Sequence, residues 1–276
     1  MTYDEFEPID HGPRSNESAF GDLDSPRVAR ETAEARRQVG QLVVERLPFT
    51  IGIVDNDATL KRVQALRQVA YGRHLPDLAP TFGRPDPMDR SPDATLFYAQ
   101  DKITGQMVGS ARLQSNRNGP LLIEGSLTLP PRLQGRLLSE VARLTVLPGY
   151  TPPVRLALVK VIHLFCIANQ IGGIVVGARR SLLRTYENIG FSDLYGDNRM
   201  VPLAHTSGMP HRVLFRDTVT SEAEGRARNH PDYAFVFRTY HPDITVFEPV
   251  LTQTHRGIVI TPADDDRDER YRSKAA

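Results

Sequence analysis

The chain has 276 residues, a formal net charge of +1, 40% hydrophobic and 24% charged residues, which is ordinary for a globular protein. This charge creates no overall field for a polyanion, so nucleic-acid binding has no support beyond local arginine clusters. The single cysteine, Cys166, excludes an internal disulfide and every metal site built from several cysteines. We therefore expect one main domain in a reducing compartment, the cytoplasm.

The two ends of the chain differ in composition from its middle. Residues 1–25 are acidic and rich in Ser, Gly and Pro, which predicts a flexible arm that is neither a secretory signal nor a membrane anchor. Residues 26–47 lose the glycines and gain Ala, Glu, Arg and Leu, which predicts a helical extension. The main domain is expected over residues 48–250. Residues 251–276 hold a charge run typical of a solvated tail.

The first elements of the main domain alternate in type. Residues 50–57 predict a strand. Residues 58–74 predict a helix with one apolar face, formed by Leu60, Val63, Leu66, Val69 and Ala70. Residues 75–92 are rich in proline and contain three aspartates, so we expect an ordered loop or lid without regular structure. Two apolar runs around DKITGQ then predict an antiparallel hairpin over 95–114.

The second half begins with an apolar segment, SEVARLTVLP (139–148), that reads as a long strand ending at a proline. Residues 152–172 predict a buried amphipathic helix, too short and too charged to span a bilayer. Residues 173–178 predict an apolar strand, and 181–191 a short helix with Ser181 as N-cap and Gly190 as its stop. From 200 to 247, strand-like RVLFRDT alternates with polar SEAEGRARN.

This order of elements is similar to that of the GNAT acyltransferase superfamily. RTYENIGF (184–191) resembles the late helix of that superfamily, and VARLTVLPGY (141–150) lies about forty residues earlier, as it does there. The resemblance covers roughly residues 50–195. It implies an α+β fold with a central mixed, mostly antiparallel sheet, whose splayed strands are flanked by helices.

Three segments resemble a narrower branch. VGSARLQ (108–114) resembles a strand of the autoinducer (acyl-homoserine lactone) synthases, SEVARLTV resembles their ELSRFAV segment with Ala142 in place of serine, and DPMDRSPDATLFYAQ (86–100) resembles their paired acidic residues. FeeM-like N-acyl amino acid synthases share this skeleton and move a long acyl chain from acyl carrier protein to the amine of an amino acid. The chain lacks the tryptophan typical of autoinducer synthases, which favours the FeeM-like branch.

The segment after the long strand bears on the acyl donor. Acetyl-CoA enzymes of this superfamily hold a pyrophosphate there on a glycine-rich turn at a helix N-terminus. This chain has YTPPVRLAL, in which Pro152 and Pro153 have no N–H. A donor on acyl carrier protein has only the phosphopantetheine phosphate, so we expect acyl-phosphopantetheine as the donor and no permanently bound cofactor. The eight histidines show no metal-ligand spacing, so no metal is expected.

Charged residues within apolar strands are the candidate site. The resemblance makes Glu140 the acceptor of the amine proton; the structural alternative is a carboxylate paired with Arg143 or Arg136. Arg112 and Arg143 need a carboxylate partner if they are buried. In the structural alternative this partner is Glu140, Asp86 or Asp89; in the functional one it is the carboxylate of the acceptor. Residues three apart on a strand face opposite sides, so Glu140 and Arg143 share a site only if Glu140 precedes the strand or a bulge intervenes.

Further roles come from the resemblance. Tyr186 matches the tyrosine that protonates the departing thiolate, or it is a packed helix aromatic. Asp86 and Asp89 bind the acceptor ammonium or cap turns. An unpaired main-chain N–H within 145–147 faces the thioester carbonyl. The candidates for docking the carrier protein are the basic residues of GARRSLLR: Arg179, Arg180 and Arg184. The structural alternative is that they form a solvated basic turn. Cys166 and His163 are expected to be packing residues.

The predicted function is an acyl carrier protein-dependent N-acyltransferase that makes an N-acyl amino acid. The alternatives are an acyl-homoserine lactone synthase, an acyl-CoA N-acetyltransferase, and a catalytically silent GNAT-like binding module. The expected partners are acyl carrier protein and an amino acid, with no nucleic acid and no transmembrane segment. A lipid product would allow peripheral contact with a membrane.

Overall fold

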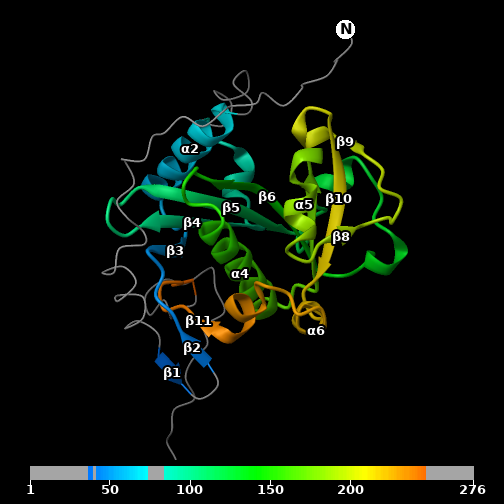
Figure 1. Ribbon diagram of the computed structural model, residues 1–276. Coiled ribbons are helices and arrows are strands. Elements are labelled where there is room, and N and C mark those ends of the chain that lie inside the picture. The colour runs from blue at the N-terminus through cyan, green and yellow to red at the C-terminus, as the bar shows by residue number, and fades with distance from the viewer. Residues whose placement is uncertain (1–36, 40–41, 74–83, 247–276) are drawn as a thin grey trace, which may run out of the picture.

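The computed structural model describes residues 37–39, 42–73 and 84–246 (Figure 1). The predicted arm (1–25), the predicted tail (251–276) and part of the predicted loop (75–92) lie outside the described residues. Within them, one sheet runs in the order β3-β4-β5-β6-β7-β10-β8, with β9 paired to β10. Its strands are β3 (Phe49–Ile53), β4 (Ala94–Asp101), β5 (Met107–Ser115), β6 (Leu138–Val146), β7 (Gly173–Ala178), β8 (Ser192–Asp193), β9 (Val201–Leu203) and β10 (Met209–Asp217).

This sheet is mixed and mostly antiparallel, as the resemblance implied. Among the pairings of the eight strands, only β6 with β7 is parallel. These two strands pair over Leu138–Val141 and Gly173–Val176, and then β6 continues to Val146 without β7. The two strands therefore part near Ala142, which is the splay expected of a GNAT-like α+β fold.

The principal helices lie on opposite faces of the sheet: α2 (Asp57–Gly72) and α4 (Pro153–Ala168). Alternate residues of β5 point to opposite sides, and Ala111 and Leu113 belong to the core that contains Val154 and Leu158 of α4. A Cβ on Gly109 would lie 2.5 Å from Val154, so glycine permits α4 to approach β5 closely. Arg112 consequently points to the α2 face.

Local sequence accounts for most element boundaries. The Asn56 side chain accepts a hydrogen bond from Thr59 N (2.8 Å) and caps α2. Gly190 has φ +89° after α5 (Leu183–Glu187), which confirms it as the stop. The predicted N-cap Ser181 is wrong: it lies inside the 3₁₀ turn η5 (Arg180–Leu182), and α5 begins two residues later without a side-chain cap.

The predicted helical extension is also wrong for the described part of 26–47. There the chain forms β1 (Arg37–Val39) and β2 (Leu42–Val44), which pair with each other, and β2 pairs in parallel with β11 (Thr239–Tyr240). Pairing with a distant strand thus overrides helix propensity. Polar SEAEGRARN mostly forms α6 (Ser221–Ala227), and the π-helical turn η7 (Ala234–Arg238) follows.

A buried lysine joins this C-terminal segment to α4. Lys160 Nζ donates to the carbonyl oxygens of Phe235 (2.8 Å) and Thr239, and it lies 3.0 Å from His241 Nδ1. Burial lowers the pKa of Lys160 to about 8. The contacts fix the segment after α6 against α4 and β2. In the part of the chain that the structure describes, no helix has the length and apolarity to cross a membrane.

Candidate functional site

A chain of ion pairs runs through the α2 face of the sheet. Arg67 Nη1 of α2 lies 2.6 Å from Asp89 Oδ2, and Asp89 Oδ1 lies 3.1 Å from Arg112 Nη1. The same Arg112 nitrogen is 2.8 Å from Asp86 Oδ2, which is 3.2 Å from Arg143 Nη2. We call these five residues the ionic cluster. Both arginines singled out in the sequence have Asp86 as a partner, so the structural alternative, in which carboxylates of the protein pair with them, is realised.

A β-bulge brings Arg143 to this face. Arg112 is paired with Ala142 and Ser110 with Thr145, so Arg143 and Leu144 together oppose Ala111. Arg143 has φ +56°, a conformation that is uncommon for a residue with a side chain. A bulge, one of the two conditions under which Glu140 and Arg143 could share a site, is therefore present. Glu140 and Arg143 do not pair with each other, and Arg136 pairs with Asp217 (2.8 Å), so the structural pairing considered for Glu140 is wrong.

The acidic residues come from a short 3₁₀ turn, η2 (Pro87–Arg90). Asp86 caps it by accepting a hydrogen bond from Met88 N (3.0 Å), so the turn-capping alternative is also realised. Burial alone would raise the pKa of Asp86, but the charge and hydrogen bond of Arg112, the Met88 N–H and the charge of Arg143 lower it overall. Asp86 therefore stays ionised between two guanidinium groups.

Buried polar atoms on this face lack partners. Three guanidinium groups meet two carboxylates in the ionic cluster, which leaves one positive charge in excess. Among the described residues, the buried atoms of this face without a hydrogen-bond partner include Arg67 Nε and Nη2, Arg112 Nε, Ser110 Oγ, Gln114 Oε1 and His205 Nδ1. Ser110, Arg112 and Gln114 alternate along β5 and so share one face. Because buried polar groups in proteins are normally hydrogen-bonded, these atoms require partners that the surrounding side chains do not supply.

Glu140 lies beside the ionic cluster in a more apolar environment. It is on the same face as Arg112, and its β7 neighbour Val175 belongs to an apolar cluster with Ile123. Its Oε2 accepts a hydrogen bond from Ile123 N (3.0 Å), and its Oε1 lies 3.3 Å from His205 Nε2. Burial raises the pKa of Glu140 to about 7, against the main-chain hydrogen bonds and the Arg112 charge. Such a carboxyl group can exchange a proton near neutral pH.

The other predicted site residues lie outside the ionic cluster. Tyr186 is buried in the core on α5 and makes an edge contact with Phe191; burial raises the pKa of its hydroxyl, which keeps it protonated. The N–H of Leu147 donates to Val108 O (2.8 Å), so the prediction of a free amide there is wrong for this residue. Arg179 is half-buried and Arg180 exposed on the turn that leads into α5, and Arg184 is exposed on α5 itself.

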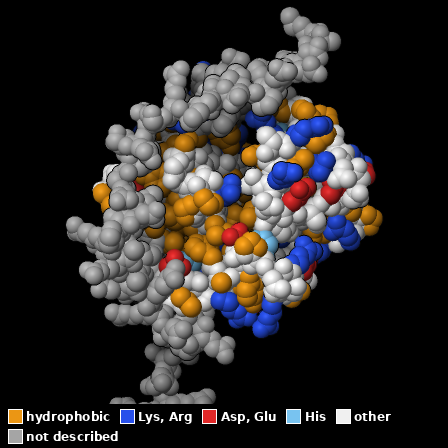
Figure 2. Space-filling model, viewed as in Figure 1, with side chains coloured by type: hydrophobic (Ala, Val, Ile, Leu, Met, Phe, Trp, Pro, Cys, Tyr) orange, Lys and Arg blue, Asp and Glu red, His pale blue; other side chains and the backbone are white. Residues whose placement is uncertain are grey.

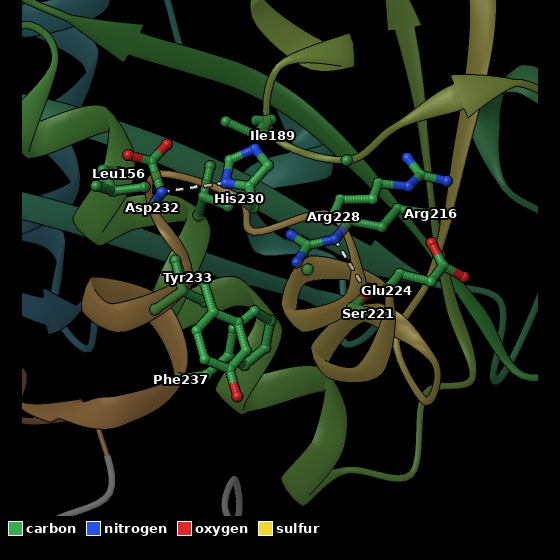
Figure 3. Close-up of a pocket in the computed structure, with 14 residues that line it drawn as sticks. Leu156, Ile189, Arg216, Ser221, Glu224, Arg228, His230, Asp232, Tyr233 and Phe237 are labelled. Atoms are coloured by element: carbon green, nitrogen blue, oxygen red, sulfur yellow. Dashed lines mark hydrogen bonds between the residues drawn. The ribbon is translucent and has the colours of Figure 1, made fainter.

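A pocket elsewhere contains none of the predicted site residues. Figure 3 shows it between α4, α6 and the start of η7, with Arg216 Nε donating to Ser221 Oγ (3.1 Å) and Asp232 N donating to His230 Nδ1 (3.1 Å). Its ionisable lining includes both signs of charge, and Leu156 and Val159 supply the apolar wall from α4. In the described residues, no group of acidic, histidine or cysteine side chains is arranged to hold a metal ion.

Sequence reasoning missed Arg67 and His205. Arg67 lies in a regular amphipathic helix, one residue after Leu66, where an arginine is usually exposed. The only sign in the sequence that Arg67 is buried is its spacing: it follows Val63, which lies on the apolar face of the helix, by four residues. His205 lies in a polar turn, η6 (Ala204–Thr206), and nothing local connects it with Glu140, 65 residues earlier in the sequence.

Comparisons with known proteins give matches in structure only. No model of a protein family and no curated protein sequence matches the chain. Similar solved structures include FeeM, an N-acyl amino acid synthase from uncultured soil microbes (13% identity, 63% of this chain and 93% of that one, TM-score 0.48). Another is BjaI, a CoA-dependent acyl-homoserine lactone synthase (16%, 70% and 93%, 0.45). A GNAT acetyltransferase from Staphylococcus aureus Mu50 is also similar (16%, 61% and 99%, 0.41).

Proposed function

We propose that this protein is a cytoplasmic N-acyltransferase that moves a long-chain acyl group from acyl carrier protein to the amine of an amino acid. The observation that carries the proposal is the set of unpartnered buried polar atoms beside the ionic cluster. Arg67 and Arg112 supply N–H donors, while Gln114 and Ser110 supply oxygen acceptors. An amino acid brings a carboxylate and an amine, which are the complementary groups.

In the proposed reaction, Arg143 and the buried arginines bind the acceptor carboxylate, and Glu140 removes a proton from the amine. The amine nitrogen attacks the thioester carbonyl carbon; a C–N bond forms and the C–S bond breaks. Tyr186 supplies the proton that the departing thiolate takes up. Water then returns a proton to the Tyr186 hydroxyl, and Glu140 releases the proton that it took from the amine. Glu140 suits its role because its pKa of about 7 lies near physiological pH.

The start of α4 supports a carrier-bound donor. Pro152 occupies the N-cap position without a side-chain cap, and Pro153 is the first helical residue, so neither offers an N–H to a pyrophosphate. A phosphopantetheine donor does not need that turn. The parting of β6 from β7 near Ala142 is the place in the sheet where we expect a pantetheine arm to approach Arg143.

The product class is the direct test. Organic extracts of bacteria that express the protein, compared by mass spectrometry with an empty-vector strain, should contain long-chain N-acyl amino acids. Expression of the Glu140→Gln variant should give the empty-vector profile. Acyl-homoserine lactones as the sole new product would instead identify an autoinducer synthase, and acetyl-CoA binding without any new lipid would contradict the proposal.

Carrier docking gives a second test. Acyl carrier protein presents an acidic face. On the side of this protein where α5 lies, Figure 2 shows several Lys or Arg side chains with acidic side chains between them. Reversal of the exposed Arg180 and Arg184 to Glu should raise the KM for acyl carrier protein thioesters, with a strong salt dependence, and should spare acyl-pantetheine. Reversal of Arg226 and Arg228, exposed on α6, is the control with the same change in charge. An equal loss of activity with the carrier protein thioester and with acyl-pantetheine would show that these arginines do not take part in docking.

A further inference from the structure

His205 is held on a well-anchored turn beside Glu140. The N–H of Ala204 donates to Ser126 Oγ (2.8 Å), which ties η6 to the segment after the 3₁₀ turn η3 (Leu122–Gly125). Thr206 Oγ1 donates to Leu203 O (2.9 Å), and the Leu203 side chain is fully buried. The imidazole is therefore placed by a rigid scaffold and not by a free loop.

The contact between the two side chains joins a buried group to a more accessible one. His205 Nε2 lies 3.3 Å from Glu140 Oε1; the His205 side chain is 20% exposed and the Glu140 side chain 2%. Among the described residues, no other basic side chain is within ion-pair distance of Glu140. His205 is therefore the side chain that is placed to hold Oε1 of this carboxyl group.

The surrounding charges set which of the two groups holds a shared proton. Burial, then His211 of β10, then Arg143 and Arg112 lower the pKa of His205, against a contact with the Leu122 main chain. Burial and the charge of Glu124 on η3 raise the pKa of Glu140 to about 7. Main-chain hydrogen bonds from Ile123 and Leu122 and the charge of Arg112 act in the opposite direction and lower it. The pKa of Glu140 thus lies above that of His205, which is the reverse of the usual order of these two residue types. Above pH 7 the imidazole is therefore uncharged and Glu140 is ionised, so a neutral imidazole faces a carboxylate.

We propose that His205 is a positioning residue for Glu140: when the carboxyl group is ionised, His205 Nε2–H donates a hydrogen bond that holds Oε1 in place. The inference rests on the proposed function, in which Glu140 takes a proton from the amine.

Titration of Glu140 by NMR tests this contact without any substrate. With ¹³C-labelled glutamate, His205→Phe should raise the midpoint of the Glu140 carboxyl carbon by about one pH unit or more, because the carboxylate loses a charge-assisted hydrogen bond. His205→Gln, whose amide nitrogen can reach Oε1, should restore it. His205→Asn is too short and should behave like the Phe variant, so the test survives if the Phe variant fails to fold. His211→Gln is the control, since His211 faces His205 and does not touch Glu140.

Kinetics complete the test. A rise of one unit from a pKa of about 7 lowers the ionised fraction of Glu140 at pH 7 from about one half to about one tenth. His205→Asn should therefore lose about fivefold in kcat at pH 7, recover at higher pH, and keep the wild-type KM for the acceptor. An unchanged midpoint in His205→Asn would overturn the inference. A shifted midpoint in a protein that yields no N-acyl product would uphold the contact and contradict the proposed function, so the two failures are distinguishable.

Discussion

Glu140→Gln lowers turnover by about 10²–10⁴-fold, the usual contribution of one general base, while the protein stays folded. The amide oxygen can still accept the hydrogen bond from Ile123 N, but it cannot take up a proton near neutral pH. The measurement is kcat with a saturating acceptor at pH 7–8. Glu124→Gln is the matched control: Glu124 is a near neighbour whose Oε1 accepts from Leu121 N (2.9 Å), and glutamine preserves that bond.

The same substitution should stabilise the protein above pH 7. The folded-state pKa of Glu140, about 7, lies above its ordinary value of 4.5. The folded state therefore binds more protons between those values, and stability falls as the pH rises through them. A shift of this size corresponds to a cost on the order of 3 kcal/mol above pH 7. Thermal unfolding should show Glu140→Gln gaining stability over wild type at pH 8 and little difference at pH 4.

Two results would contradict this account of Glu140. Normal turnover in Glu140→Gln would remove it from proton transfer, whatever the stability. A lower melting temperature at pH 8 would show that the carboxylate is better compensated in its buried position than its surroundings indicate.

Asp89→Ala should be among the most destabilising single changes in the protein. Its carboxylate lies between Arg67 Nη1 (2.6 Å) and Arg112 Nη1 (3.1 Å), and neither Arg67 nor Arg112 is more than 2% exposed. Removal of the carboxylate leaves Arg67 unpaired and Arg112 with Asp86 alone. Breaking a buried ion pair in this way costs roughly 3–5 kcal/mol. Chemical denaturation should show this loss in the free energy of unfolding.

The exposed pair of Arg90 and Asp57 is the control. Arg90 Nη2 lies 2.7 Å from Asp57 Oδ1, and both side chains are more than half exposed. Arg90→Ala should change the free energy of unfolding by less than about 1 kcal/mol. Equal effects of the two variants would show that the ionic cluster is hydrated and not buried. By the same reasoning, Arg112→Ala is expected to lose stability, so Arg143→Ala, whose side chain is 30% exposed, is the better variant for measuring acceptor use.

Local signals in the sequence were sufficient for the regular elements. Two apolar runs around a turn predicted β4 and β5, helical spacing predicted α2 and α4, and Gly190 predicted the end of α5. These signals depend on which side chains face the core, and a residue's neighbours in sequence carry that information. The same signals failed at β1 and β2, because pairing with β11, almost 200 residues later, decides their conformation.

The charged residues of the candidate site were recognisable for a related reason. Arg112, Glu140 and Arg143 interrupt apolar strands, and a buried charge requires a partner, so a polar site and the need for a bulge could be predicted. The partners could not: Asp86 serves both arginines only because η2 folds against β5 and β6.

Arg67 and His205 were decided by tertiary structure alone. Arg67 is buried because Asp89 meets it from a segment after α2, and His205 reaches Glu140 because η6 packs on η3. Sequence spacing does not encode distances between residues on separate elements. The sequence by itself thus determined which elements form and that charge is buried among them; the packing of those elements decided which charges meet, because ion pairs depend on distances in space.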